Sequence, residues 1–336
     1  MPAMKKTHAT DKMHATDATD ATDDDNRAVS EAAAEVAAGV GAALVAALPS
    51  LECDVPLAPL CAYGVGGPAE YLFAARSQAQ LERAVALALE LSLPLTVLGQ
   101  ATNVLIADAG LRGLVVLARN AETHMEGELL TVGAGAVVPE LVTSLAEQGL
   151  GGLEFAGNIP GSVGGAVVGN AGAYGRDVAG ALVTASLLVG GEVRSCDATE
   201  LGMDYRTTAL KRGELDAVLL AATFALRGGE RGKLLAEIER DAELRRSKHP
   251  LEYASCGSYF KNPSSETPAA ALIERAGLKG FALGGASVSS KHANFLVAAP
   301  GCRAAEIRAL ASEVKHRVFE VTGVQLEEEV LHLGFA

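Results

Sequence analysis

The feature that most constrains this chain is the segment GNIPGSVGGAVVGNAGAYG, residues 157–175, which holds seven glycines and no charged side chain. Glycine loses more conformational freedom on folding than any other residue. A cluster this dense therefore marks backbone that must adopt left-handed angles or lie against something bulky. We expect the segment to be a loop that wraps closely around another element or a ligand.

A second loop of the same character is GQATN, residues 99–103. Both loops follow predicted strands and offer backbone N–H groups together with Asn, Ser or Thr side chains, which bind anions without a lysine. Two interpretations stay open on these residues alone. The glycines could allow close packing of a helix on a sheet. They could also form a neutral cradle, which suits the pyrophosphate of a dinucleotide better than a transferable phosphate.

Composition excludes several classes of protein. A net charge of −13 over 336 residues argues against a nucleic-acid partner, because such proteins carry basic faces. Five cysteines without a CxxC pair indicate a reducing compartment and no metal site. Residues 1–28 repeat Ala-Thr-Asp and predict a disordered acidic tail without signal-peptide character. Residues 29–48 are Ala-rich and favour a surface helix over a membrane span, so we expect a cytoplasmic protein.

The periodicity from residue 70 predicts a β-α-β unit. EYLFAA alternates like a strand, and Ser77 opens a helix with Gln80 in capping-box position. Pro94 closes that helix, the short buried strand LTVLG follows, and LRGLVVLA is a further strand. Residues 129–226 add the strand LLTVGAG, the helix VPELVTSLAEQG and two strands around ALVTASLLV and AVLLAATFAL. This is an α+β pattern with helices packed outside sheets.

The texture changes near residues 228–232, where we place a domain boundary. A charged helix, KLLAEIERDAELRRSK, follows, and a later helix ends at Gly323. On the later helix the periodicity predicts one buried face, formed by Ile307, Leu310, Val314 and Val318. The predicted organisation is a tail at 1–28, a lead helix and connector at 29–62, a first domain at 63–228 and a second domain at 229–336.

Three polar residues stand in apolar surroundings: Ser258 in SCGSYFKNP, Arg206 in MDYRTTALK and Glu329 in QLEEEVLHLG. Read singly, each fits an ordinary turn or solvated position. The string around Ser258 lacks the GxSxG elbow of a serine hydrolase. Cys256 is read as a packed thiol, because nothing in the sequence indicates a lowered pKa.

Together these pieces resemble one family, the bacterial UDP-N-acetylenolpyruvoylglucosamine reductases. The resemblance runs from about residue 61 to 334 and rests on the ordered strings GVGGPAEY, LGQATNVLIADAG, GLEFAGNIPGSVGGAVVGNAGAYG, YRTTALK, HPLEYASCGSYFKNP, LIERAGLKG, VSSKHANFLV and LEEEV. It implies a two-lobed FAD-binding domain of the vanillyl-alcohol-oxidase type and a C-terminal α/β substrate-binding domain. It further implies non-covalent FAD, NADPH as hydride donor and UDP-N-acetylglucosamine enolpyruvate as substrate. The run KHPLEYASCGS resembles the shorter type, which lacks an inserted tyrosine-bearing loop.

The resemblance also assigns roles. It implies that Ser258 protonates the substrate while Arg206 and Glu329 stabilise the anion. The implied FAD contacts are Gly99, Gln100, Ala101, Thr102, Asn103, Gly157, Ile159, Pro160, Gly161, Ser162, Gly164, Gly165, Asn170 and Gly172. The implied substrate contacts are Tyr205, Lys261, Asn262, Lys291 and Asn294. The chain departs from the family at Gln100-Ala101, where Gly-Gly or Gly-Ser is usual, and at Cys256, where a smaller residue is usual.

Two rival hypotheses remain at this stage. A related flavin oxidase acting on a sugar or alcohol would have no use for Ser258. A non-catalytic flavin or nucleotide-sugar binding protein would need no proton donor at all. We expect a monomer without a nucleic-acid or membrane partner.

Overall fold

The computed structural model describes residues 39–335. Contacts divide the chain into two units, Met1–Pro49 and Ser50–Ala336. In the first unit, residues 39–47 form a helix, which agrees with part of the expected lead helix. The predicted acidic tail at 1–28 lies outside the described residues. The second unit contains all the elements below and is described by itself. Within residues 39–335, no helix has both the length and the apolar composition needed to cross a membrane.

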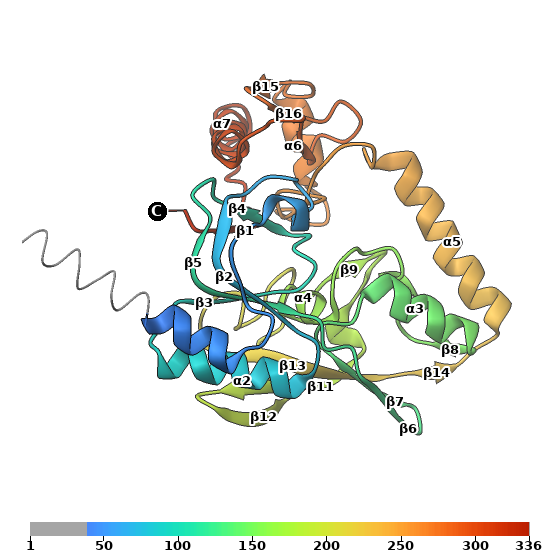
Figure 1. Cartoon of the computed structure of the whole chain (residues 1–336). Helices are drawn as coiled ribbons and strands as arrows, with labels where there is room; N and C mark the ends of the chain where they lie inside the picture. Colours follow the sequence, from blue (N-terminus) through green and yellow to red (C-terminus); the bar gives the residue numbers. More distant parts are fainter. Residues whose placement is uncertain (1–38, 336) are drawn as a thin grey trace, which may run out of the picture. The chain divides into compact units, whose positions relative to one another are not determined.

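The first sheet has the order β1-β2-β5-β3 (Figure 1). Strands β2 (Pro68–Ala75), β5 (Leu111–Ala118) and β3 (Leu95–Leu98) are parallel, and β1 (Glu52–Pro56) is antiparallel to β2. Helix α2 (Gln78–Glu90) joins β2 to β3, so the predicted β-α-β unit is confirmed. Its capping box is modified. The hydroxyl of Ser77 accepts from the N–H of Gln80 at 3.3 Å, but the Gln80 side chain accepts from Arg76 instead of Ser77.

The second sheet is antiparallel and has the order β12-β11-β13-β7-β6. The predicted strands and helix of this block are all present. The strands are β6 (Thr123–Glu126), β7 (Leu129–Gly133), β11 (Leu182–Val189), β12 (Glu192–Cys196) and β13 (Val218–Ala225). Helices α3 (Val138–Glu147) and α4 (Val163–Val168) belong to the same lobe, and α4 packs on β7 and β13. Two small pairs, β8 (Leu150–Gly151) with β14 (Arg227–Gly228) and β9 (Gly172–Ala173) with β10 (Arg176–Asp177), complete it. The short 3₁₀ helices are η1 (Ala58–Leu60), η2 (Glu154–Ala156) and η3 (Val178–Gly180).

Helix α5 (Arg231–Lys248) leads from this lobe to the C-terminal elements, as its long diagonal course in Figure 1 shows. A small antiparallel sheet, β15 (Ala282–Leu283), β16 (Ala286–Val288) and β17 (Leu296–Ala298), packs against α7 (Ala304–Thr322). Helix α6 (Ala269–Arg275) packs on α7. The predicted α+β class is confirmed, whereas the domain boundary near residues 228–232 stays a prediction.

One pairing has no counterpart in the sequence analysis. Strand β18 (Leu331–Leu333) returns to the lobe that contains the first sheet and pairs in parallel with β4 (Val104–Ile106). Strand β4 directly follows the loop 99–103. The N–H of Leu331 also donates to Asn103 O at 3.1 Å. The end of the fold is therefore attached to one of the two glycine-rich loops.

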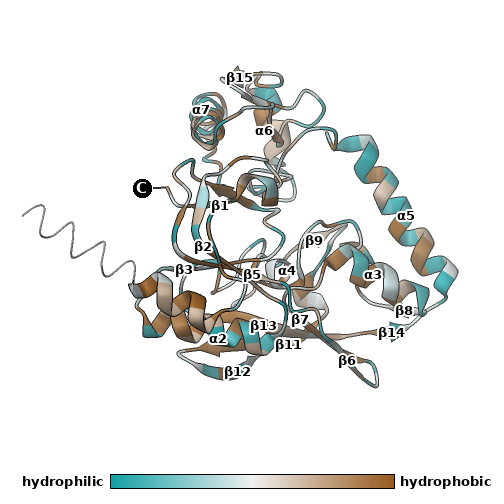
Figure 2. Cartoon of the chain, viewed as in Figure 1, coloured by the Kyte–Doolittle hydropathy of each residue, from teal (hydrophilic) through white to brown (hydrophobic). Residues whose placement is uncertain are grey.

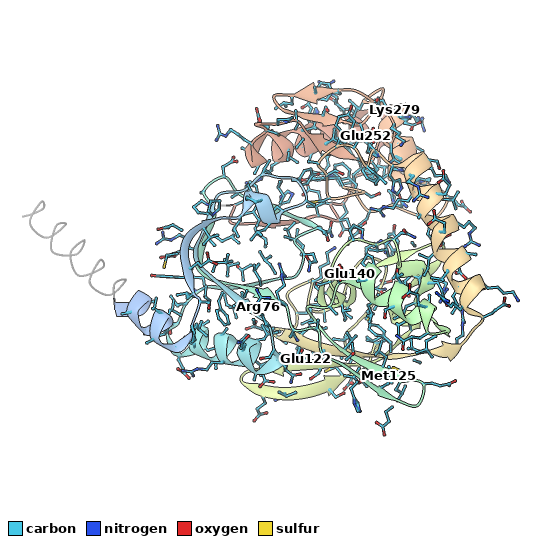
Figure 3. All side chains as sticks on the ribbon, turned by 45° about the vertical axis from the view of Figure 1, so that its right-hand side comes forward. Arg76, Glu122, Met125, Glu140, Glu252 and Lys279 are labelled. Atoms are coloured by element: carbon cyan, nitrogen blue, oxygen red, sulfur yellow. The ribbon has the colours of Figure 1, made fainter. Side chains whose placement is uncertain are left out.

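Buried apolar residues of the unit Ser50–Ala336 form cores that include the following three. One lies under the first sheet, one under the second, and one joins α6, α7 and β15–β17 to Tyr63 and Leu105. All four residues predicted on one face of α7 are fully buried, and Gly323 ends that helix with φ +72°. In Figure 2 the buried strand β5 is mostly brown, the colour of hydrophobic residues, whereas α5 shows both hydrophobic and hydrophilic residues. Glu122 and Glu140, which are labelled in Figure 3, are exposed polar residues.

Candidate active site

A cavity of about 1180 Å³ is the centre of the candidate site. It lies entirely within the unit Ser50–Ala336. Its lining includes both glycine-rich loops and all three predicted catalytic residues, Arg206, Ser258 and Glu329. Ligand pockets hold roughly 300–1,000 Å³, so this cavity has room for a large cofactor together with a second ligand.

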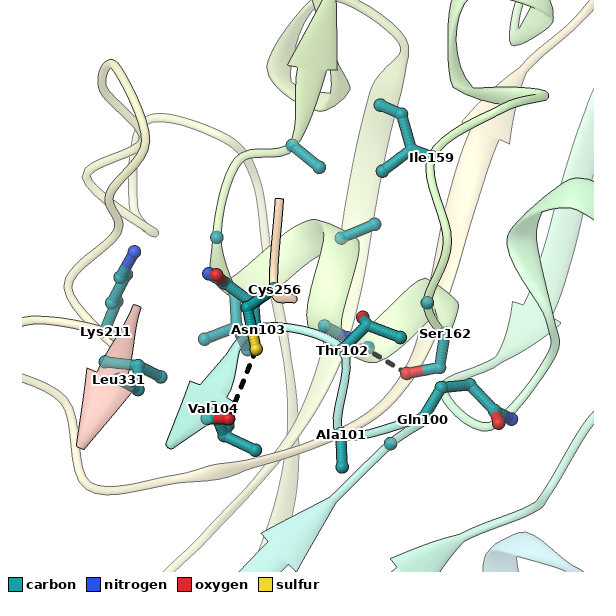
Figure 4. Close-up of a pocket in the computed structure, with 18 of the residues that line it drawn as sticks. Gln100, Ala101, Thr102, Asn103, Val104, Ile159, Ser162, Lys211, Cys256 and Leu331 are labelled. Carbon is teal, nitrogen blue, oxygen red and sulfur yellow. Dashed lines mark hydrogen bonds between the residues drawn. The ribbon is translucent and has the colours of Figure 1, made fainter. Parts of the chain in front are cut away.

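The loop 99–103 connects β3 to β4 and lies directly against the glycine segment (Figure 4). A methyl group added at Gly99 would lie 2.0 Å from Ser162 Oγ, so a side chain at this position would displace the Ser162 hydroxyl. Thr102 Oγ1 donates to Pro160 O at 3.0 Å and joins the loops a second time. Ala101 has φ +47°, a left-handed conformation that glycine adopts without strain.

Helix α4 continues the glycine segment and begins at Ser162, whose hydroxyl accepts from the N–H of Gly165 at 3.3 Å. Close packing holds this segment in place: a methyl group at Gly164 would lie 3.1 Å from Ala134, and one at Gly172 would lie 2.5 Å from Arg176 O. The close-packing interpretation of these glycines is therefore confirmed. The packed segment forms part of the wall of the cavity.

The structure supports the anion-binding side of the second interpretation. In the part of the chain that the structure describes, the backbone N–H groups of Gln100, Ala101 and Thr102 donate to no protein acceptor. All three residues line the cavity, where no acidic side chain belongs to either loop. An uncharged wall with free donors fits the pyrophosphate of a dinucleotide.

Arg206 reaches the cavity from a tight turn. Asp204 and Thr207 pair across this turn, and Arg206 itself has φ +56°. Its guanidinium donates to the carbonyl groups of Asn170 and Gly172 in the glycine segment. Its Nε lies 3.4 Å from Glu329 Oε1. The arginine therefore connects the glycine segment to the predicted catalytic carboxyl group.

Ser258 and Glu329 come from two short segments that run antiparallel. The N–H of Glu329 donates to Tyr259 O, the N–H of Lys261 donates to Glu327 O, each at 2.8 Å, and Phe260 pairs with Glu328. Gly257, with φ +81°, turns the chain just before Ser258. Within residues 39–335 the Ser258 hydroxyl makes no hydrogen bond to a protein partner. It is therefore available to a ligand in the cavity.

Burial raises the pKa of Glu329, although Arg206, Lys211 and Lys261 lower it. The net result is a pKa above the ordinary value, which favours a protonated carboxyl group. In a protonated form Glu329 donates a hydrogen bond. The group next to Arg206 can therefore act with it as a second donor to developing negative charge.

The predicted substrate residues divide into two groups. Tyr205, Asn262 and Asn294 line the cavity. The Asn294 amide holds the backbone of Phe260, because it accepts from Phe260 N–H and donates to Phe260 O. Lys261 and Lys291 are not in the lining. Lys261 pairs with Glu327, and Lys291 Nζ donates to Arg246 O at 2.8 Å.

Two predicted cofactor residues also stand apart from the cavity lining. Gly157 lines a small neighbouring pocket beside α5. Asn170 is buried and fixes the loop by donating to Asp204 O at 2.9 Å and accepting from the N–H of Ala179. The other predicted cofactor residues all line the cavity.

Cys256 lines the cavity but is a packed thiol, as expected. Its Sγ donates to Val104 O at 3.4 Å, and burial raises its pKa well above the ordinary value (Figure 4). No cluster of three His, Cys, Asp or Glu side chains able to hold a metal occurs among the described residues.

Sequence reasoning missed Lys211. It lies in the string YRTTALK and lines the cavity, and its Nζ donates to the backbone carbonyls of both Arg206 and Glu329. The only sequence signal was a lysine five residues after Arg206, which by itself indicates nothing.

Residues 69–197 match the FAD binding domain family, and residues 249–333 match the C-terminal domain of UDP-N-acetylenolpyruvoylglucosamine reductase. Together with the cavity that both glycine-rich loops line, these matches place the chain among the flavoprotein oxidoreductases.

Relatives and a solved structure give the particular family. The chain is 42% identical over 288 residues to UDP-N-acetylenolpyruvoylglucosamine reductase of Rubrobacter xylanophilus, covering 85% of this chain and 96% of that protein. It is 41% identical over 286 residues to the enzyme of Lactobacillus delbrueckii subsp. bulgaricus, covering 84% and 95%. The crystal structure of the Thermus caldophilus enzyme superposes with a TM-score of 0.71 at 30% identity, covering 84% of this chain and 98% of that one. The chain belongs to the UDP-N-acetylenolpyruvoylglucosamine reductase family.

Proposed function

We propose that this protein uses NADPH to reduce the enolpyruvyl group of UDP-N-acetylglucosamine enolpyruvate. The product is UDP-N-acetylmuramate, a precursor of peptidoglycan. The observation that carries the proposal is that Ser258, Arg206 and Glu329 line the same cavity as the two uncharged loops.

The loops 99–103 and 159–172 would hold FAD, because they carry no charged side chain and residues 100–102 offer free backbone N–H groups for its pyrophosphate. When bound there, FAD would supply the hydride chemistry, with NADPH as the source of the hydride. Everything else in the reaction falls to the side chains of this chain.

Addition of hydride to the methylene carbon of the enolpyruvyl group places negative charge on the adjacent carbon and on the carboxylate. Arg206 and protonated Glu329 would stabilise that charge, because they lie 3.4 Å apart and are largely shielded from water. The Ser258 hydroxyl would then give its proton to the carbanion and regain one from solvent. An alcohol is a feeble acid, but a carbanion is basic enough for the transfer to run downhill.

The test is Ser258→Ala. NADPH should still bleach the flavin of the variant, whereas turnover of the enolpyruvyl substrate should fall by about 10² to 10⁴-fold, the usual contribution of a positioned proton donor. Ser264→Ala is the matched control, because Ser264 is an exposed serine of the same stretch. Unchanged turnover in Ser258→Ala would refute the role.

The same experiment separates the rival functions. Rapid reoxidation of the bleached protein by oxygen, without any response to the enolpyruvyl substrate, would indicate a flavin oxidase. A protein that binds flavin and nucleotide sugar but never reoxidises with the substrate would be a binding protein. In both cases the proposed reduction would be wrong.

A further inference from the structure

Lys211 occupies a junction of three parts of the site. Its Nζ donates to Glu329 O at 2.9 Å and to Arg206 O at 3.2 Å. Asn103, from the loop 99–103, donates its Nδ2 to the same carbonyl of Glu329 at 3.3 Å. The carbonyl oxygen of Glu329 and the Lys211 ammonium group thus connect the turn of Arg206, the segment before β18 and the loop 99–103.

Burying a lysine ammonium group at this place costs free energy unless its hydrogen bonds compensate for the loss of water. Burial lowers the pKa of Lys211, while Glu329 raises it when its carboxyl group is ionised. An ammonium group has three N–H donors and no acceptor. Two of these donors hold backbone carbonyls that belong to the two residues proposed to stabilise the substrate anion.

Both contacted segments require external support. Arg206 has the left-handed φ of +56°, and such strained residues persist only where the surroundings hold them. Glu329 lies at the end of the fold and reaches the site through β18 and the short pairing with Tyr259. Arg206 and Glu329 are far apart in the sequence, so neighbouring residues cannot fix one relative to the other. Lys211 connects their backbones directly.

We propose that Lys211 is a positioning residue of this site, which fixes the backbone of Arg206 to that of Glu329 so that both side chains face the reacting end of the substrate. The inference rests on the proposed function for the roles of Arg206 and Glu329. The charged groups around Glu329 are Arg206, Lys211 and Lys261, and those around Lys211 are Glu329, Arg206, Lys261 and Glu327. Loss of the Lys211 charge therefore raises the pKa of Glu329 further.

The experiment uses Lys211→Met, which keeps the length of the side chain and removes its charge and donors. FAD content and bleaching by NADPH should stay close to wild type. The step with the enolpyruvyl substrate should slow by about 10²-fold with little change in KM, because a shift of about 1 Å in a positioned group costs that much. Lys279→Met is the control, since Lys279 is half-exposed and pairs with Glu274 on the outer face of the C-terminal elements (Figure 3).

A second readout needs no turnover. The titration of Glu329, followed by NMR of labelled glutamate and assigned with Glu329→Gln, should move to higher pH in Lys211→Met. In the Glu329→Gln background, Lys211→Met should slow the reaction much less than in wild type, because the two residues act through one arrangement.

The proposal is overturned if Lys211→Met reacts at the wild-type rate with an unchanged titration of Glu329. It is also overturned if KM rises while kcat stays the same, which would make Lys211 a substrate ligand. If Lys211→Met fails to retain FAD, Lys211→Arg decides, because it keeps the charge and the donors. A rate within about tenfold of wild type supports positioning, and a loss beyond about 10²-fold with FAD bound refutes it. Failure of the proposed function shows instead as wild-type protein that never reoxidises with the substrate, and the Glu329 titration then still tests Lys211.

Discussion

The contact between Gly99 and Ser162 predicts that Gly99→Ala weakens FAD binding. The added methyl group would lie 2.0 Å from Ser162 Oγ and 3.0 Å from Ser162 Cβ, so the Ser162 side chain and the loop that carries it must shift. Neither loop moves freely, because Arg119 Nη1 donates to Gly99 O at 2.9 Å and Ser162 is 2% exposed.

The magnitude follows from two terms. Overpacking costs about 1–3 kcal/mol, and displacement of the Ser162 hydroxyl from its position at the start of α4 costs about 1 kcal/mol more. If the free protein relaxes by opening the loops, the total of about 2–4 kcal/mol appears as a Kd for FAD raised about 30- to 1000-fold.

The assay is titration of apoprotein with FAD, followed by flavin fluorescence. Ser162→Gly removes the group that the methyl meets and by itself costs only a few tenths of a kcal/mol in capping. The double variant Gly99→Ala/Ser162→Gly should therefore bind within about tenfold of wild type. Gly228→Ala is the matched control, because a methyl group there meets nothing within 4 Å. Wild-type affinity in Gly99→Ala, or a double variant no better than the single one, would refute the reasoning.

Two further predictions concern buried groups. Burial raises the pKa of Glu154, but the N–H of Gly152 and the Arg176 guanidinium at 3.0 Å outweigh it and hold that pKa below its ordinary value. Arg176→Met should therefore lower stability at neutral pH by about 2 kcal/mol, less than for a fully buried pair, because Arg176 is partly exposed and Arg227 lies 3.9 Å away. The deficit should shrink as falling pH protonates Glu154, and urea unfolding at neutral and acidic pH measures it; a deficit that grows in acid would contradict the assignment. Iodoacetamide should label Cys256 at least about 100-fold more slowly than the exposed Cys53, because burial raises the pKa of the Cys256 thiol. Equal labelling of the two by peptide mass spectrometry would mean that the loop over Cys256 opens.

Local patterns predicted the elements whose causes are local. The spacing of Ile307, Leu310, Val314 and Val318 predicted the buried face of α7, because a helix places such residues on one side wherever it packs. The alternation in EYLFAA and the apolar run LRGLVVLA are also local patterns, and they predicted β2 and β5. The glycine-rich loops were identifiable because close approach leaves a compositional signature.

Features that depend on distant contacts could not be predicted in this way. The parallel pairing of β18 with β4 joins opposite ends of the fold, and neither three-residue strand carries a signal of its partner. Lys211 acts through backbone carbonyls, which look the same in every residue type. Lys261 and Lys291 were expected to line the substrate side, but Glu327 and the carbonyl of Arg246 hold them elsewhere. Their role as substrate contacts stays a prediction.

The pairing of β18 with β4 also has a consequence for biosynthesis. Translation delivers residues 329–333 after every other part of the site, and domains generally fold from the N-terminal side as they emerge. Until then β4 lacks its partner β18, and the Glu329 carbonyl that Lys211 and Asn103 share has not been synthesised. The nascent protein can therefore pair the strands of its two larger sheets before residues 329–333 complete the site.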